Sequence, residues 1–308
     1  MRTFIYLAAL CVLIGTGSNV LAANPRTFVS GSGNDNDPCS LLKPCRTFNR
    51  AMAQTDPGGE VVALDSAGYG TFIVNKAVTI EAAPGVYAGI TVTGTAPTIA
   101  IDVAAGAADA VTLRGLTINS LNSNSVGIRF LSGAALHIEN CIFKSNDIGV
   151  WSLGAGTLDI RDSIFRENFD GIRIEPSAGT SFATVHNVRL ENNTDGLGAV
   201  DGATVTVQDS VASGNANLGF GAFSFSGRPA ELNLENCVST GNAHFGVAVF
   251  SLSNAAAIVR LSNSTITNNN VFGLNIGSSP AVLLSRGNNT IEGNATDVTG
   301  TLGSYGAR

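Results

Sequence analysis

The chain has 308 residues, a net charge of -6, only 13% charged and 6% aromatic residues, and 36 glycines. Nucleic-acid binding needs clustered lysines and arginines, so this acidic composition argues against nucleic acid as a partner, and also against anionic membrane surfaces. The hydrophobic share of 44% is enough for a sizeable core. Few charges combined with many β-branched and turn-forming residues favour a fold made of many short strands.

Residues 1–23 have the features of a signal peptide. Arg2 supplies the positive start, an apolar run from Phe4 to Ile14 follows, and small residues near Ala23 offer a cleavage site. The apolar run is too short to span a bilayer, and no other segment resembles a membrane span. We therefore expect a protein that is secreted or periplasmic after cleavage and that does not insert into a membrane.

Residues 24–59 are expected to cap one end of the domain. Cys39 and Cys45 lie close together in the sequence, and in an oxidising compartment such a pair predicts a disulfide. The alternative is a metal-binding pair, which is disfavoured because no histidine or further cysteine lies nearby. Residues 46–54 fit an amphipathic helix whose Phe48, Ala51 and Met52 cover the first coil of the domain.

A repeated unit dominates the rest of the chain. Each copy contains a turn, a glycine and a short alternating strand, and the glycine recurs at intervals that grow from 22 residues, between positions 127 and 149, to 27, between 246 and 273. A second alternating strand keeps step with it and ends in Asn or Asp, as at Asn140, Asp162 and Asn187. These are the spacings of a repeat architecture in which each strand buries one face.

The repeat is too short for a helical crossover between parallel strands but fits a coil of three short strands. Stacked coils would pair each strand with its neighbours about 4.8 Å above and below. The sequence therefore predicts an all-β solenoid, a parallel β-helix over residues 60–298, followed by a tail at 299–308. Asn140, Asp162 and Asn187 should then stand in one column.

The repeats resemble those of the pectin-lyase-like superfamily of right-handed parallel β-helix proteins. The opening segments at residues 27–35, 44–48 and 58–62 are similar to the start of secreted bacterial β-helix repeat proteins of unassigned function. The resemblance implies that the β-helix is right-handed. Because this scaffold supports lyases, hydrolases, epimerases, tailspikes and adhesins, it implies no single activity.

Asp170, Asp195 and Arg173 are the candidate catalytic residues. Asn193 to Gly196 and Gly171 to Ile174 resemble two polygalacturonase motifs, but their order is reversed and that family's paired-aspartate and His-Gly motifs are missing. Asp147, Asp170 and Asp195 are expected near the same turn of successive coils. At a separation of roughly 5 Å, Asp170 and Asp195 could act as a hydrolytic pair, or they could be solvated turn residues, which is the favoured interpretation.

A second candidate site is an outward-facing column of Arg129, Trp151 and Arg173. It continues through small residues at 198, 221 and 248, which predict a flat strip. An exposed tryptophan between two guanidinium groups could stack on a sugar ring and pair with a uronate carboxylate. The alternative is that Trp151 packs beneath a loop while the arginines pair with nearby carboxylates.

Three hypotheses follow for the function. The first is a non-catalytic β-helix that binds a polysaccharide or a cell-surface glycan along one face, through Arg129, Trp151 and Arg173. The second is a polysaccharide lyase or glycoside hydrolase acting on uronate-containing glycans. The third is a structural adhesin or envelope protein. No cofactor or metal site is expected, except calcium in the lyase alternative. The sequence leaves the oligomeric state open.

Overall fold

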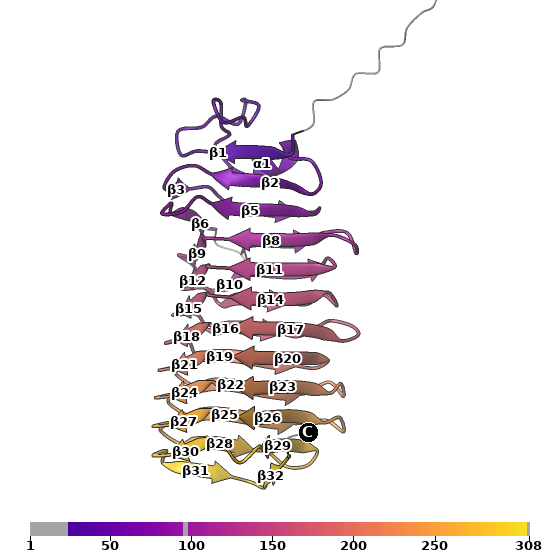
Figure 1. The fold of residues 1–308 in the computed structure, drawn as a ribbon, viewed down its shortest axis with the longest axis vertical. Coiled ribbons are helices and arrows are strands. Elements are labelled where there is room, and N and C mark those ends of the chain that lie inside the picture. The colour runs from indigo at the N-terminus through magenta and orange to yellow at the C-terminus, as the bar shows by residue number, and fades with distance from the viewer. Residues whose placement is uncertain (1–23, 95–97, 307–308) are drawn as a thin grey trace, which may run out of the picture.

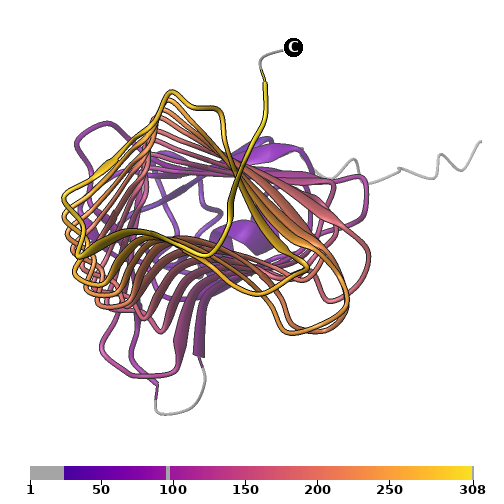
Figure 2. The same ribbon diagram turned by 90° about the horizontal axis from the view of Figure 1, so that it is seen from below.

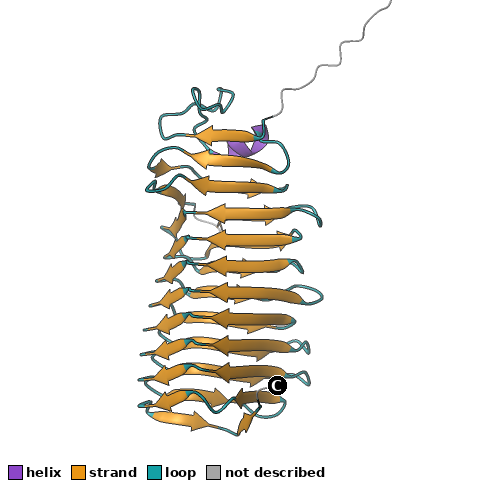
Figure 3. Ribbon diagram, viewed as in Figure 1, coloured by secondary structure: helices purple, strands orange, loops and turns teal. Residues whose placement is uncertain are grey.

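The computed structural model describes residues 24–94 and 98–306, which form a right-handed parallel β-helix (Figures 1 and 3). In these residues, three parallel sheets of 12, 10 and 10 strands run along the molecule. The predicted fold class is therefore confirmed. The expected signal peptide, residues 1–23, lies outside the described residues.

We call the three faces sheets 1, 2 and 3. Sheet 1 has the strand order β1 (Arg26–Val29), β2 (Gly59–Ala63), β5 (Val78–Ala82), β8 (Ala110–Arg114), β11 (Ala135–Glu139), β14 (Thr157–Arg161), β17 (Ser181–His186), β20 (Ala203–Gln208), β23 (Ala230–Glu235), β26 (Ala257–Ser262), β29 (Ala281–Ser285) and β32 (Leu302–Ser304). Sheet 2 has the order β4 (Phe72–Val74), β7 (Thr98–Ala104), β10 (Ser125–Ser132), β13 (Ile148–Ser152), β16 (Asp170–Ile174), β19 (Asp195–Val200), β22 (Leu218–Ser224), β25 (Phe245–Ser251), β28 (Phe272–Ile276) and β31 (Thr296–Thr299). Sheet 3 has the order β3 (Ala67–Gly68), β6 (Ala88–Val92), β9 (Leu116–Ser120), β12 (Ile142–Lys144), β15 (Ile164–Arg166), β18 (Arg189–Glu191), β21 (Val211–Ser213), β24 (Val238–Thr240), β27 (Thr265–Thr267) and β30 (Thr290–Glu292).

Successive coils stack in register. Glu139 pairs with Arg161 and Arg161 with His186, so the next residues, Asn140, Asp162 and Asn187, follow one another in the predicted column. These three residues have φ angles of 54°, 51° and 52°, in the left-handed region that Asn and Asp tolerate. The side-chain amide of Asn187 donates to Asp162 at 2.6 Å, so this exposed ladder bonds along the axis.

A second asparagine ladder lies buried at the turn between sheets 3 and 2. From Asn146 to Asn269, each side-chain amide donates to the Oδ1 atom of the asparagine in the next coil, at 2.8–3.1 Å. The backbone N–H of the same residue donates to the same oxygen, so one side chain satisfies two donors of the preceding turn. Asn294 ends the ladder and donates to Asp297 instead. The ladder consists of Asn146, Asn168, Asn193, Asn215, Asn242, Asn269 and Asn294.

The repeated glycine is required by the close approach of the coils. A Cβ atom on Gly196 would lie 2.3 Å from the carbonyl oxygen of Gly219, its counterpart in the next coil. A Cβ on Gly149 would meet the carbonyl oxygen of Gly171 at 2.5 Å. Because backbone stands in the way, any side chain at this column would push two coils apart.

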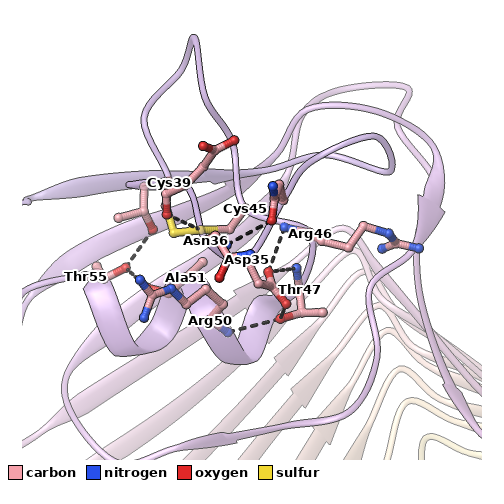
Figure 4. The surroundings of a disulfide bond; sticks show 12 residues. Asp35, Asn36, Cys39, Cys45, Arg46, Thr47, Arg50, Ala51 and Thr55 are labelled. Atoms are coloured by element: carbon pink, nitrogen blue, oxygen red, sulfur yellow. Dashed lines mark hydrogen bonds between the residues drawn. A yellow bond between two sulfur atoms is a disulfide. The ribbon is translucent and has the colours of Figure 1, made fainter.

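The N-terminal end is covered as predicted. Helix α1 (Phe48–Gln54) buries Phe48, Ala51 and Met52, and the Thr47 hydroxyl caps it by accepting from the N–H of Arg50 at 3.2 Å. Cys39 and Cys45 form the expected disulfide, with 4.6 Å between their Cα atoms, directly above this helix (Figure 4). This closes the first coil against solvent.

The loop before the helix is held by one carboxylate. Asp35 accepts from the backbone N–H groups of Arg46 and Thr47, at 2.8 and 2.9 Å, and from the Thr47 hydroxyl (Figure 4). The disulfide and this carboxylate therefore fix both ends of the segment that leads into the capping helix.

The C-terminal end carries strands rather than a helix. Strand β32 lies within the segment expected as a tail, and it pairs with β29 through Leu302 and Leu283. Figure 2 shows the β-helix from this end, with the C-terminal strands in yellow. In the parts of the chain that the structure describes, α1 is the one helix, and none is long or apolar enough to cross a membrane.

Candidate functional site

Two carboxylates from neighbouring coils meet on the outer face of sheet 2. Asp170 at the start of β16 is the register partner of Asp195 at the start of β19. Paired strands lie about 4.8 Å apart, so the carboxylates are immediate neighbours. Asp147 lies near the same turn of the preceding coil, as predicted, where its carbonyl oxygen accepts from the N–H of Asp170 at 2.7 Å. It stands one residue before Ile148, the register partner of Asp170, and does not line the pocket described below.

An arginine lies beside the pair and is itself held by acidic groups. The Nη1 atom of Arg173 is 3.4 Å from Oδ2 of Asp170, and its Nε donates to Glu175 at 2.9 Å. The Arg173 side chain is 36% exposed. It therefore neutralises part of the negative charge while its outer edge stays in contact with solvent.

An amide extends the polar row on the other side. Nδ2 of Asn217 donates to Oδ1 of Asp195 at 2.7 Å, and Oδ1 of Asn217 lies 3.1 Å from Nδ1 of His244. These side chains come from three successive coils. The row orients Asp195 by binding one of its oxygen atoms.

A hollow of about 240 Å³ opens beside these residues. Its lining combines the polar groups Asp170, Arg173, Asp195 and Asn217 with Ile172, Gly198, Val200, Leu218, Phe223 and Phe225. The hollow exists because position 198 has no side chain: a Cβ placed there would have the Phe223 ring as its nearest neighbour, at 3.8 Å. It is thus a pocket with one charged end and one aromatic wall.

The aromatic wall is built by the end of β22 and the loop that follows it. Phe223 and Phe225 stack with ring centroids 5.6 Å apart, and Phe225 is 47% exposed. Buried Asp201 accepts from the backbone N–H of Phe225 at 2.9 Å and of Ser226 at 3.0 Å, which fixes the turn that carries the exposed ring. Arg228 in the same loop donates to the carbonyl oxygen of Gly179 at 3.2 Å.

The pocket raises the pKa values of its two carboxyl groups. Burial raises the pKa of Asp170 to about 6; the Arg173 guanidinium opposes this shift, while the Asp195 and Asp147 charges add to it. Burial also raises the pKa of Asp195, against the hydrogen bond from Asn217 and the charge of Arg173. Asp170 can therefore bind and release a proton near neutral pH, as a general acid or base requires.

The predicted column of Arg129, Trp151 and Arg173 is in register, but its surroundings differ from those expected. Arg129 is engaged by both oxygens of Asp102, at 3.0 and 2.8 Å. Trp151 is half-buried rather than exposed, and its indole N–H is buried with no acceptor among the described residues. Of these three residues, Arg173 alone lines the pocket.

The structure also contradicts the flat strip that was predicted at positions 198, 221 and 248. The ring of Phe223 covers Gly221 so closely that a Cβ there would lie 2.4 Å from it, and Ala248 is 1% exposed. Only Gly198 of the three remains open, at the pocket. The sequence reasoning missed the phenylalanines, although a signal was present: Val200, Phe223 and Phe250 form one outward column.

Metal binding has little support in this pocket. Two carboxylates, one already paired with a guanidinium, are far fewer than the six to eight oxygen ligands that calcium takes. Across residues 24–94 and 98–306, no three His, Cys, Asp or Glu side chains gather into a group that could hold a metal ion. The residues do not fit the calcium expected in the lyase alternative.

Comparison with known proteins identifies the fold. A family model described as "Right handed beta helix region" matches residues 100–296. No curated protein matches the sequence. Solved structures with a similar fold include the pectate lyase Pel9A, at 17% identity and a TM-score of 0.63, covering 87% of this chain and 79% of that one. A rhamnogalacturonan lyase is 14% identical with a TM-score of 0.56, covering 88% and 87%. The periplasmic alginate epimerase AlgG is 10% identical with a TM-score of 0.51, covering 81% and 78%.

Proposed function

This chain belongs to the right-handed β-helix family, and we propose that it binds a polysaccharide in the pocket at Asp170 and Asp195. The observation that carries the proposal is the pocket's composition. Hydrogen-bonding groups at one end face an exposed phenylalanine ring at the other, the arrangement that suits a sugar with hydroxyl edges and apolar C–H faces. The solved structures of similar fold are named as enzymes of polysaccharides, which agrees with this ligand class.

The size of the pocket limits what it holds. Its volume of about 240 Å³ lies just below the range of roughly 300–1,000 Å³ typical of small-molecule pockets. It therefore suits one sugar unit of a longer chain, with the neighbouring units lying along the face of sheet 2. Arg129 and Trp151 stand on the adjoining coils and are proposed as secondary contacts for those units.

Affinity electrophoresis against neutral, acidic and amino polysaccharides tests the binding. We expect retardation by at least one polymer, and Phe225→Ala should weaken it about tenfold, because stacking on the ring buries apolar surface. Phe182→Ala is the matched control, since Phe182 is 56% exposed on sheet 1. No retardation by any polymer, or equal loss in both variants, would contradict the proposal.

A second candidate is hydrolysis of the bound glycan. It is favoured by the proximity of Asp170 and Asp195 and by the pKa of about 6 for Asp170. In this candidate Asp170 donates a proton to the leaving oxygen while ionised Asp195 stabilises or attacks the sugar, the division of labour in retaining enzymes. Release of reducing ends from a bound polymer, lost in Asp170→Asn but kept in Asp209→Asn, would establish it.

We also propose that the protein works outside the cytoplasm. The disulfide between Cys39 and Cys45 fits an oxidising compartment, and residues 1–23 carry the features of a signal peptide. Sequencing the N-terminus of the protein recovered from its natural source tests this: a mature start near residue 24 is expected, and an intact Met1 would contradict it.

A further inference from the structure

The charge of the pocket narrows the class of glycan, if the proposed binding function holds. Asp170 and Asp195 line the pocket with a single arginine, and that arginine already bonds Asp170 and Glu175. Carboxylates therefore outnumber guanidinium groups at the charged end. The protein as a whole is acidic as well, with a net charge of -6.

A ligand that covers this end removes water from both carboxylates. Asp170 is already only 8% exposed, and its one cationic neighbour among the pocket residues, Arg173, is shared with Glu175, so further loss of solvent leaves the two carboxylates only partly compensated. A uronate would bring another carboxylate beside the pair, and like charges in a poorly hydrated site repel. The pocket is therefore unfavourable for the acidic sugars that the Arg129–Trp151–Arg173 column suggests from sequence.

One carboxylate oxygen is placed to receive a donor. Among the described residues, Asn217 is the hydrogen-bond donor to Asp195, and it uses Oδ1. Oδ2 therefore remains free for a ligand. A group with several N–H donors and a positive charge would satisfy Oδ2 and offset the charge of Asp170 on the neighbouring strand.

We propose that the pocket binds a sugar unit carrying a free ammonium group, as in a glucosamine polymer without N-acetyl groups, in preference to neutral or uronate units. The ammonium group lies between Asp195 and Asp170, and the apolar face of the sugar rests on the phenylalanine wall.

Titration calorimetry with three sets of short soluble oligosaccharides tests the proposal: glucosamine oligomers, their N-acetylated counterparts and oligogalacturonates. At pH 7 and low salt, we expect glucosamine oligomers to bind at least tenfold more tightly than the N-acetylated ones, with oligogalacturonates weakest. Added salt should reduce this preference for glucosamine oligomers, because salt screens the attraction between the ammonium group and the carboxylates. Asp195→Asn, which keeps the size of the side chain, should bring glucosamine oligomers to the affinity of the N-acetylated ones.

Asp209→Asn provides the control, because it removes a carboxylate from the exposed ladder between sheets 1 and 3 rather than from the pocket. It should leave the preference unchanged. Equal binding of the amine and N-acetyl forms, or tighter binding of oligogalacturonates, would overturn the ammonium proposal and leave glycan binding standing. A persistent preference in Asp195→Asn would also overturn it. Absence of binding throughout a wider polysaccharide panel would overturn both proposals.

Discussion

Asp170 and Asp195 occupy the same position of adjacent strands, so two carboxylates that are one coil apart in sequence become direct neighbours at the edge of a pocket. The solenoid creates this proximity without any local motif. It also means that the chemistry of the site depends on residues from several coils, Arg173 and Asn217 among them.

Because Asp170 is buried, its carboxyl group should make the free energy of unfolding fall as pH rises, whereas a carboxylate in a strong ion pair has the opposite effect. Its native pKa of about 6 is above the ordinary value of 3.8, so the folded protein binds this proton more tightly than the unfolded chain. The resulting stability is present below about pH 4 and is lost as pH rises through 6. Arg173 opposes the shift, whereas Asp195 and Asp147 reinforce it.

Asp170→Asn should therefore raise the free energy of unfolding near pH 8, by at most about 3 kcal/mol, an upper limit that already includes the attraction to Arg173 because the pKa of about 6 is a net value. Near pH 4 the two proteins should be closely matched. Urea unfolding of both proteins at both pH values measures the difference. A variant that is less stable than the parent at pH 8 would show that Asp170 contributes to stability there.

The buried asparagine ladder should contribute more to the free energy of unfolding than the exposed ladder of Asn and Asp residues. Asn215 receives hydrogen bonds from Asn193 and donates to Asn242 and to the carbonyl oxygen of Leu190. Asn215→Ala leaves several of these groups unpaired and buried, at a cost of about 3 kcal/mol. Asn187→Gly in the exposed ladder is the control, because glycine tolerates the left-handed φ of 52° at this position. Its expected cost is about 1 kcal/mol, because water replaces the partner of the lost side chain. Thermal unfolding compares the two, and equal costs would contradict this ranking.

Two glycines in one strand should respond in opposite ways to alanine. Gly196→Ala forces a Cβ to within 2.3 Å of the Gly219 carbonyl oxygen, so we expect a loss of more than about 2 kcal/mol in stability. Gly198→Ala places its methyl group 3.8 Å from the Phe223 ring, at an ordinary van der Waals distance. It should keep the fold and reduce glycan affinity by narrowing the pocket. Denaturant midpoints and affinity electrophoresis of both variants provide the test, which fails if both variants unfold alike.

The disulfide should stabilise the N-terminal cap to a modest extent. Cys39 and Cys45 enclose a short loop, with a sequence separation of 6, for which loop-closure entropy amounts to about 2 kcal/mol. Replacing both cysteines with serine should lower the melting temperature, and reductant should lower that of the parent but not of the variant.

The buried thiols Cys141 and Cys237 should stay unreactive, because burial raises their pKa values to about 12 and about 11. Labelling of two thiols in the native protein would contradict this.

Much of the architecture could be predicted from the sequence because the repeat acts through local rules. The recurring glycine marks a position where a side chain would strike the next coil, and Asn140 and Asp162 mark a left-handed turn. Alternating apolar residues specify which face of each strand is buried. Stacking follows from these rules, and with it the contact between Phe143 and Phe165, which are register partners in adjacent coils with ring centroids 4.4 Å apart.

The functional surface was decided by tertiary structure. Outward residues are not constrained by burial in the core, so periodicity predicted the column of Arg129, Trp151 and Arg173 but left open whether Trp151 is exposed and whether the arginines are paired. The pocket needs Phe225, and that ring is positioned by a loop whose turn depends on Asp201 in another coil. A repeat pattern determines how coils stack, whereas the contacts between loops of different coils, which shape the pocket, arise only once the stack has formed.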